Sequence, residues 1–343
     1  MAGERADCAA RAPVPVKREP MLERRRGLPA RSTAQWAALA AGVAVLLAGF
    51  AAAAARPLEL KPAFKAGDAF ALLMSKTRER VEGGNVVFRG RTETPVEVTV
   101  VQAGPEGWLI DWTFGRTRLV EPPNLPPPPD AALFDGVTLR LRLDANGRPR
   151  SIENYPEVRQ RIDAAIVTVL APIGDPAARG RAAALLRESL GSQQQLESLV
   201  LADIGHYFLP YSAPLDADEA RQREVELPSP AGGQPLRGTD RFTIVRLDAS
   251  GGERVVEVQW TQTMDPAELA RLARDLEQRL RDRGNMQPGV SQPQVPHDLE
   301  AQVQGRFEVP LEGLGVPRVA EIRRRSGGGG VTITDTVRFA RTR

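Results

Sequence analysis

The stretch FDGVTLRLRLDANGRPRSIENYPEVR, Phe134 to Arg159, decides the fold class. Apolar and polar residues alternate from Val137 to Leu143, which predicts a strand with one buried face. Asp144 to Gly147 (DANG) supplies residues that tolerate positive φ in a tight turn. A second strand follows, and Asn154 to Glu157 (NYPE) predicts a helix whose first turn is capped by the asparagine side chain. The stretch therefore predicts strand, turn, strand and helix.

The same alternation recurs along the chain and divides it into parts. Residues 56–208 predict a first β half, a meander that ends in this hairpin and leads into a helical segment. Residues 209–238 are rich in Pro, Gly and acids and predict a linker loop. Residues 239–343 predict a second β half with an inserted helix at 266–283. Gly305 to Arg325 echoes the opening hairpin, so duplication of the two halves is one interpretation and independent origin is the other.

These parts predict an α+β, mainly β fold. We expect a curved antiparallel sheet, with or without two duplicated halves, backed by three to four helices.

The composition is that of an ordinary globular protein with few large side chains. Of 343 residues, 42% are hydrophobic but 5% are aromatic, so the core must rest mainly on Val, Leu, Ile and Ala. Residues 1–55 hold 8 of the 46 basic and 4 of the 43 acidic residues, which leaves residues 56–343 with a net charge of −1. This charge offers no basic field for nucleic acid and argues against it as a partner.

The first 55 residues have the pattern of a leader. Arg24 to Arg26 and Arg31 form a basic region, and residues 36–55 form an apolar run that ends in small residues, as in a secretory signal peptide. The run 36–55 is also long enough to be an uncleaved membrane anchor, so both interpretations stay open. Met21 would give a leader of conventional length and is a candidate for the true start. Either route exports the rest of the chain, which predicts a periplasmic location.

Residues that could carry chemistry are few. His206 and His297 lie far apart and in no metal-binding spacing, and Cys8, the one cysteine, falls in the leader. The sequence also contains no G-x-S-x-G motif. We therefore expect no catalytic residue, no metal site, no cofactor and no enzyme activity. Gly327 to Gly330 predicts a turn, and Arg323 to Arg325 predicts a solvated strand end.

Four aromatic residues in the predicted strands are candidate ligand-binding residues. Core packing is the alternative role for each, because they are nearly the only large side chains in the sheets. On a concave face they would contact an apolar ligand such as a lipid, or a partner peptide. The four residues are Trp108, Trp112, Phe114 and Trp260.

The hairpin pattern D-x-x-G-R-x-x-S-I-E-N, Asp144 to Asn154, resembles that of exported bacterial proteins of unknown function, which are broadly similar to half-barrel lipoprotein carriers. The resemblance implies a non-catalytic envelope protein that binds an apolar ligand or a partner peptide on a concave sheet. It covers one hairpin, and the lipid-box cysteine of the lipoproteins is missing, so no functional residue is carried over. The alternative is a membrane-anchored structural or interaction protein whose partner is another envelope protein.

Overall fold

Antiparallel strands are the main elements of the chain that the structure, a computed structural model, describes. The described residues are 58–123, 129–212, 215, 220–227, 234–248, 253–284 and 299–342. The strands are β1 (Ala69–Glu82), β2 (Asn85–Gly104), β3 (Gly107–Phe114), β4 (Arg118–Glu121), β5 (Thr138–Asp144), β6 (Pro149–Ile152), β7 (Arg221–Leu227), β8 (Leu236–Asp248), β9 (Val255–Met264), β10 (Glu300–Pro310), β11 (Val319–Gly328) and β12 (Val331–Arg341). The helices are α2 (Pro129–Ala132), α3 (Tyr155–Leu170), α4 (Pro176–Ser189), α5 (Gln193–Tyr207), the 3₁₀ turn η1 (Leu209–Ser212) and α6 (Pro266–Gly284).

All twelve strands join one sheet in the order β6-β5-β3-β2-β1-β12-β11-β10-β9-β8-β7, with β4 beside β2. The strands that precede the helical segment lie on one side and those that follow it on the other. They meet where β1 pairs with β12, from Leu72↔Arg341 to Glu82↔Val331. The sheet is not closed, because β6 and β7 end it in the part of the chain described. A mainly β antiparallel fold with four long helices is therefore confirmed, and duplication of its halves stays a prediction.

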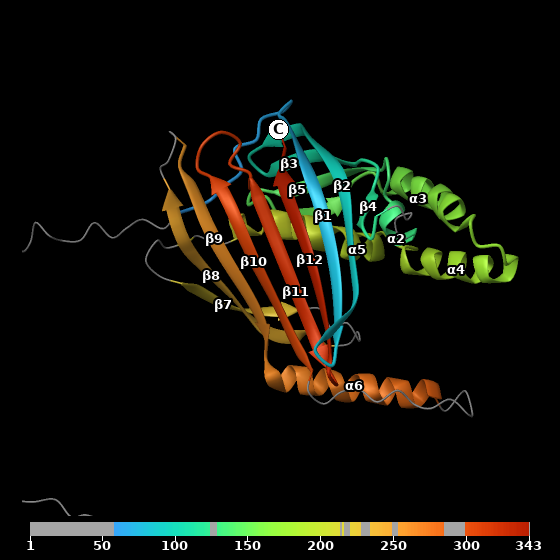
Figure 1. Cartoon of the computed structure of the whole chain (residues 1–343). Helices are drawn as coiled ribbons and strands as arrows, with labels where there is room; N and C mark the ends of the chain where they lie inside the picture. The colour runs from blue at the N-terminus through green and yellow to red at the C-terminus, as the bar shows by residue number, and fades with distance from the viewer. Residues whose placement is uncertain are drawn as a thin grey trace, which may run out of the picture. The chain divides into compact units, whose positions relative to one another are not determined.

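The sheet curves around α5 (Figure 1). Glu197 and Asp203 lie six residues apart on this helix, about 9 Å along its axis. Yet the Glu197 carboxylate accepts a hydrogen bond from Ile152 N on β6 (2.8 Å), and Asp203 pairs with Arg324 on β11 (2.6 Å). These two strands are six positions apart in the sheet order, so in a flat sheet they would lie roughly 29 Å from each other. Both contacts are possible only because the concave face wraps the helix.

The core fills the space between the concave face and α5. The helix buries a stripe formed by Leu196, Val200, Ile204 and Tyr207. Tyr207 and the following Phe208 are fully buried, and their rings lie 6.0 and 6.4 Å from that of Trp112 on β3. Apolar residues of β1, β2 and β12 complete this cluster. The helix is therefore an integral part of the core and shields the sheet's apolar face from water.

Helix α3 follows the opening hairpin as expected, but its cap was wrongly predicted. The Asn154 side chain makes no capping hydrogen bond with α3. Its Oδ1 instead accepts from Arg140 N (2.8 Å), and its Nδ2 donates to the Thr138 carbonyl (3.0 Å). Strand β6 ends at Ile152, whereas β5 extends further in this direction. The Asn154 side-chain amide therefore forms the hydrogen bonds to β5 that the next backbone groups of β6 would have formed.

The expected linker at 209–238 contains structure that the sequence analysis missed. It begins with η1 and includes β7, which pairs with β8 from Arg221↔Phe242 to Leu227↔Leu236. Charged residues are common on edge strands, and in β7 the inward-facing apolar residues are only Val225 and Leu227. An alternation of two apolar residues is too short to distinguish a strand from a loop in the sequence.

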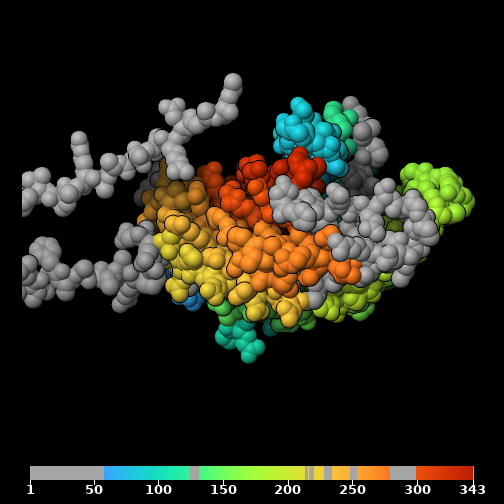
Figure 2. Space-filling view, turned by 90° about the horizontal axis from the view of Figure 1, so that it is seen from below, coloured from blue at the N-terminus to red at the C-terminus, as the bar shows by residue number. Residues whose placement is uncertain are grey.

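Helix α6 lies against the ends of the strands beside β7 and β8 (Figure 2). It starts at Pro266 after Asp265, as predicted, with Asp265 Oδ1 accepting from Ala267 N at 2.8 Å. Its buried face packs Leu272 against Leu236 in a small second apolar cluster. The predicted helix at 266–283 is therefore confirmed.

The predictions for residues 1–55, with the start at Met21, and for Cys8 and His297 lie outside the described residues. Within the described ranges, none of the helices has both the length and the apolar character needed to traverse a bilayer.

A matched pair of phenylalanines tests the position of the core. Phe339 on β12 is fully buried, whereas Phe88 on β2 is 51% exposed. We expect Phe339→Ala to lower the free energy of unfolding by about 3–5 kcal/mol, because a large cavity opens beside Trp112 and Tyr207. Phe88→Ala should change it by less than about 1 kcal/mol. Urea unfolding monitored by circular dichroism measures both. Equal losses would contradict this description of the core.

Candidate functional site between α5 and the concave face

A cavity of about 200 Å³ lies between the middle of α5 and the concave face of β1 and β2. Most of its lining side chains are apolar, and the short helix α2 contributes one wall. The lining residues are Met74, Lys76, Thr92, Thr94, Phe114, Thr117, Ala131, Phe134, Leu199, Val200, Asp203 and Ile204. The cavity is located where the apolar core gives way to polar side chains.

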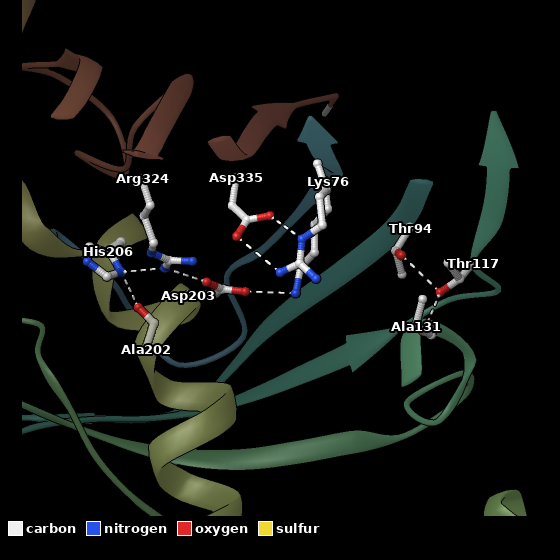
Figure 3. A network of polar contacts seen from close by, with 10 residues as sticks. Lys76, Thr94, Thr117, Ala131, Ala202, Asp203, His206, Arg324 and Asp335 are labelled. Atoms are coloured by element: carbon white, nitrogen blue, oxygen red, sulfur yellow. Dashed lines mark hydrogen bonds and ion pairs between the residues drawn. The ribbon is translucent and has the colours of Figure 1, made fainter. Parts of the chain in front are cut away.

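Two threonines in the cavity wall, Thr94 and Thr117, share a hydrogen bond. The Thr117 hydroxyl donates to the Ala131 carbonyl at 3.1 Å, so its oxygen is left to accept from Thr94 Oγ1 at 2.9 Å. This directed chain, seen in Figure 3, holds α2 against β2. Both threonine side chains are buried without an unmet hydrogen bond, so the wall that they form can contact apolar groups.

Three charged side chains meet at the polar end of the cavity (Figure 3). The Asp203 carboxylate pairs with Lys76 Nζ at 2.7 Å and with Arg324 Nη2 at 2.6 Å. The aspartate side chain is only 16% exposed, whereas that of Lys76 is 46% exposed. Burial by itself raises the pKa of Asp203, but the two cations outweigh burial and hold this pKa below its usual value. Asp203 is therefore ionised at neutral pH.

His206 lies one helical turn beyond Asp203, between Arg324 and Trp260. The Arg324 guanidinium approaches His206 Nδ1 at 3.2 Å, and Nδ1 also contacts the Ala202 carbonyl. The first contact needs a lone pair on Nδ1 and the second a proton, so the two favour opposite tautomers. Burial and the adjacent guanidinium both disfavour the imidazolium and lower the pKa of His206 to about 4. The ring is neutral at pH 7.

Of the four aromatic candidates from the sequence, Phe114 lines this cavity, 5.6 Å from the Phe134 ring. Trp112 lies in the centre of the core, and Trp260 packs against Phe242 and His206. Trp108 is half-buried and donates its indole N–H to the Phe64 carbonyl at 3.2 Å. The structure therefore brings one of the four to the cavity and places the three tryptophans in packing positions around the sheet.

Lys76 and Asp203 were not predicted from the sequence, although each interrupts an apolar pattern. Lys76 follows Phe70, Leu72 and Met74 on the same face of β1. Asp203 falls on the buried stripe of α5, between Val200 and Tyr207. Arg324, predicted to be solvated, turns to the concave side because Ile322 before it does so and side chains alternate along a strand. The signal that could have identified these residues is a charged side chain at a position that the periodicity assigns to the buried face.

The described residues contain no group of three or more His, Cys, Asp or Glu side chains arranged to hold a metal ion.

Comparison with known proteins adds little. No family model and no curated protein sequence matches this chain. Among solved structures, one of lipovitellin that concerns its lipid–protein interactions is similar, with a TM-score of 0.42 and 10% sequence identity over 82% of this chain. The match spans 25% of the lipovitellin chain. A likeness of this strength does not show a shared fold.

The environment of His206 predicts a pH dependence of stability. Between pH 6.5 and about 4 the unfolded chain protonates this histidine and the folded protein does not, so stability falls as the pH falls through this window. We expect the difference in unfolding free energy between wild type and His206→Gln to shrink by on the order of 1–2 kcal/mol from pH 7 to pH 4. Arg324, Asp203 and Asp240, the charged groups that act on the ring, remain in both proteins.

Urea unfolding at a series of pH values measures this difference. His297→Gln is the matched control and should keep the wild-type slope, because the sequence places that residue in a loop. A His206→Gln variant whose unfolding free energy runs parallel to that of wild type would contradict the assignment.

Proposed function

We propose that this chain is an exported, non-catalytic envelope protein that holds a small apolar or amphipathic molecule between α5 and the concave face of its sheet. The observation that carries the proposal is the largely apolar cavity of about 200 Å³ at this position. An apolar cavity of roughly 150 Å³ in another protein is large enough to bind benzene. A segment of an aliphatic chain therefore fits here.

Access to the cavity supports the same function. Leu199 lines the cavity and is nevertheless 56% exposed, and the side chain of Lys76 is 46% exposed. An exposed leucine at the rim of an apolar cavity is a surface that a ligand's apolar part would cover. The ligand would thus enter between α5 and β1 without unfolding of the core around Trp112.

Export to the periplasm rests on the sequence pattern of residues 1–55. Cleavage of this leader would release a soluble carrier, and retention would tether the same binding unit to the inner membrane.

Filling the cavity should abolish binding. Val200 on α5 lines the cavity and is 7% exposed, whereas Val167 on α3 is 63% exposed. We expect the purified protein to bind the neutral fluorescent probe 1-N-phenylnaphthylamine saturably, and Val200→Phe to weaken binding roughly tenfold or more by occupying the space. Fluorescence titration measures the affinity.

Val167→Phe, the same substitution on a solvent-facing helix position, should bind the probe as wild type does. Circular dichroism establishes that both variants are folded. A protein without saturable binding of the probe would overturn the proposal and favour the second interpretation of the sequence, an anchored interaction protein.

A further inference from the structure

A row of polar residues crosses the concave face next to the cavity. Directly opposed residues on eight neighbouring strands form it, and six of the eight are polar. Asp240, Arg324 and Asp335 lie two positions from the buried Phe242, Ile322 and Val337, so these members share the face of the core. The row, called the polar row below, is Arg223 (β7), Asp240 (β8), Gln262 (β9), Val303 (β10), Arg324 (β11), Asp335 (β12), Arg78 (β1) and Gly90 (β2).

Most charges of the polar row are balanced within it. Arg78 holds Asp335 through two hydrogen bonds of 2.6 and 3.1 Å. Arg223 holds Asp240 through two of 2.8 and 3.1 Å, and Gln262 donates to the other oxygen of Asp240 at 2.9 Å. Each pair is neutral and has its donors and acceptors directed at one another. Neither pair attracts an ion.

The charges beside the cavity do not cancel. Here two cations, Lys76 and Arg324, share one carboxylate, Asp203, and the neighbouring His206 is neutral at pH 7. This group therefore carries one excess positive charge. Arg324 is directed at Asp203 and His206, whereas Lys76 both lines the cavity and reaches solvent. The excess charge is thus available to a ligand at the Lys76 ammonium, which has three N–H donors.

We infer that the molecule held in the cavity is a single-chain amphiphile with a carboxylate head, bound to Lys76 and with its chain against Met74, Phe114 and Val200. The inference rests on the proposed function and names its ligand class. A carboxylate carries the one negative charge that the group lacks, whereas a phosphate monoester carries about −1.5 to −2 at pH 7. Contact with apolar walls strengthens the attraction, because fewer water molecules screen it.

Competition with the neutral probe 1-N-phenylnaphthylamine tests the inference. Dodecanoate, dodecanol and dodecyl phosphate, which share one chain length, are compared at pH 7.5 below their aggregation concentrations. We expect dodecanoate to displace the probe at a concentration roughly tenfold lower than dodecanol does, because the charged head gains a hydrogen-bonded ion pair. Dodecyl phosphate should be less effective than dodecanoate.

Variants of Lys76 separate this ion pair from the fold. In Lys76→Met, dodecanoate and dodecanol should displace the neutral probe at similar concentrations, because the ion-pair partner of the carboxylate head is gone. Lys76→Arg should restore the preference. Lys61→Met, which removes an exposed lysine paired with Glu59, is the matched control and should keep the full preference.

Each result bears on one of the two proposals. Probe binding with equal displacement by dodecanoate and dodecanol in wild type, or a preference that survives Lys76→Met, overturns the carboxylate assignment and leaves the apolar site standing. Dodecyl phosphate as the best competitor overturns it in favour of a phosphate head. A protein that does not bind the probe removes both the site and its ligand.

Discussion

The structure depends on one contact, the packing of α5 into the concave face of an open sheet. A sheet with an apolar face must bury that face, and this sheet does not close on itself to do so. Tyr207 and Phe208 at the end of α5 fill the centre of the curve. The hydroxyls of Tyr207 and Tyr211 donate to the carbonyls of Pro317 (3.0 Å) and Gly315 (2.6 Å), so neither buried tyrosine leaves its hydroxyl unpaired. These bonds fix the helix to the loop between β10 and β11.

The same helix also protects an edge of the sheet. Ile152 on β6 directs its backbone N–H to Glu197 and its carbonyl to Gln193, both on α5. No further strand can pair with β6 at this residue while the helix is in place. At the opposite edge, β7 presents the charged residues Arg221, Glu224 and Glu226 to solvent, and these charges disfavour pairing with a further strand. The two described edges are therefore kept from further strand pairing by two different means, and one of them is the helix that fills the core.

Alternation and capping patterns predicted most of the elements, because each depends on neighbours in sequence. The long strands and the helix that starts at Pro266 are of this kind. What the sequence analysis missed depends on distant partners. Asn154 bonds to β5 only because β6 stops short, and Arg324 is turned toward the core side only where α5 brings Asp203 to it. The cavity could not be predicted, since it is formed by the separation of two elements, which no local pattern encodes.

The position of the cavity follows from a change of composition on two neighbouring strands. On β1, Met74 gives way to Lys76, and on β2, Val96 gives way to Thr94, which lies opposite Met74. Asp203 of α5 faces the same region, beside the apolar Val200 and Ile204. The cavity opens to solvent at Leu199, which is 56% exposed, and at Lys76, so it is an indentation beside the core rather than a void within it. The apolar wall that solvent reaches gains no burial on folding, and this wall is the surface that the proposed ligand would cover.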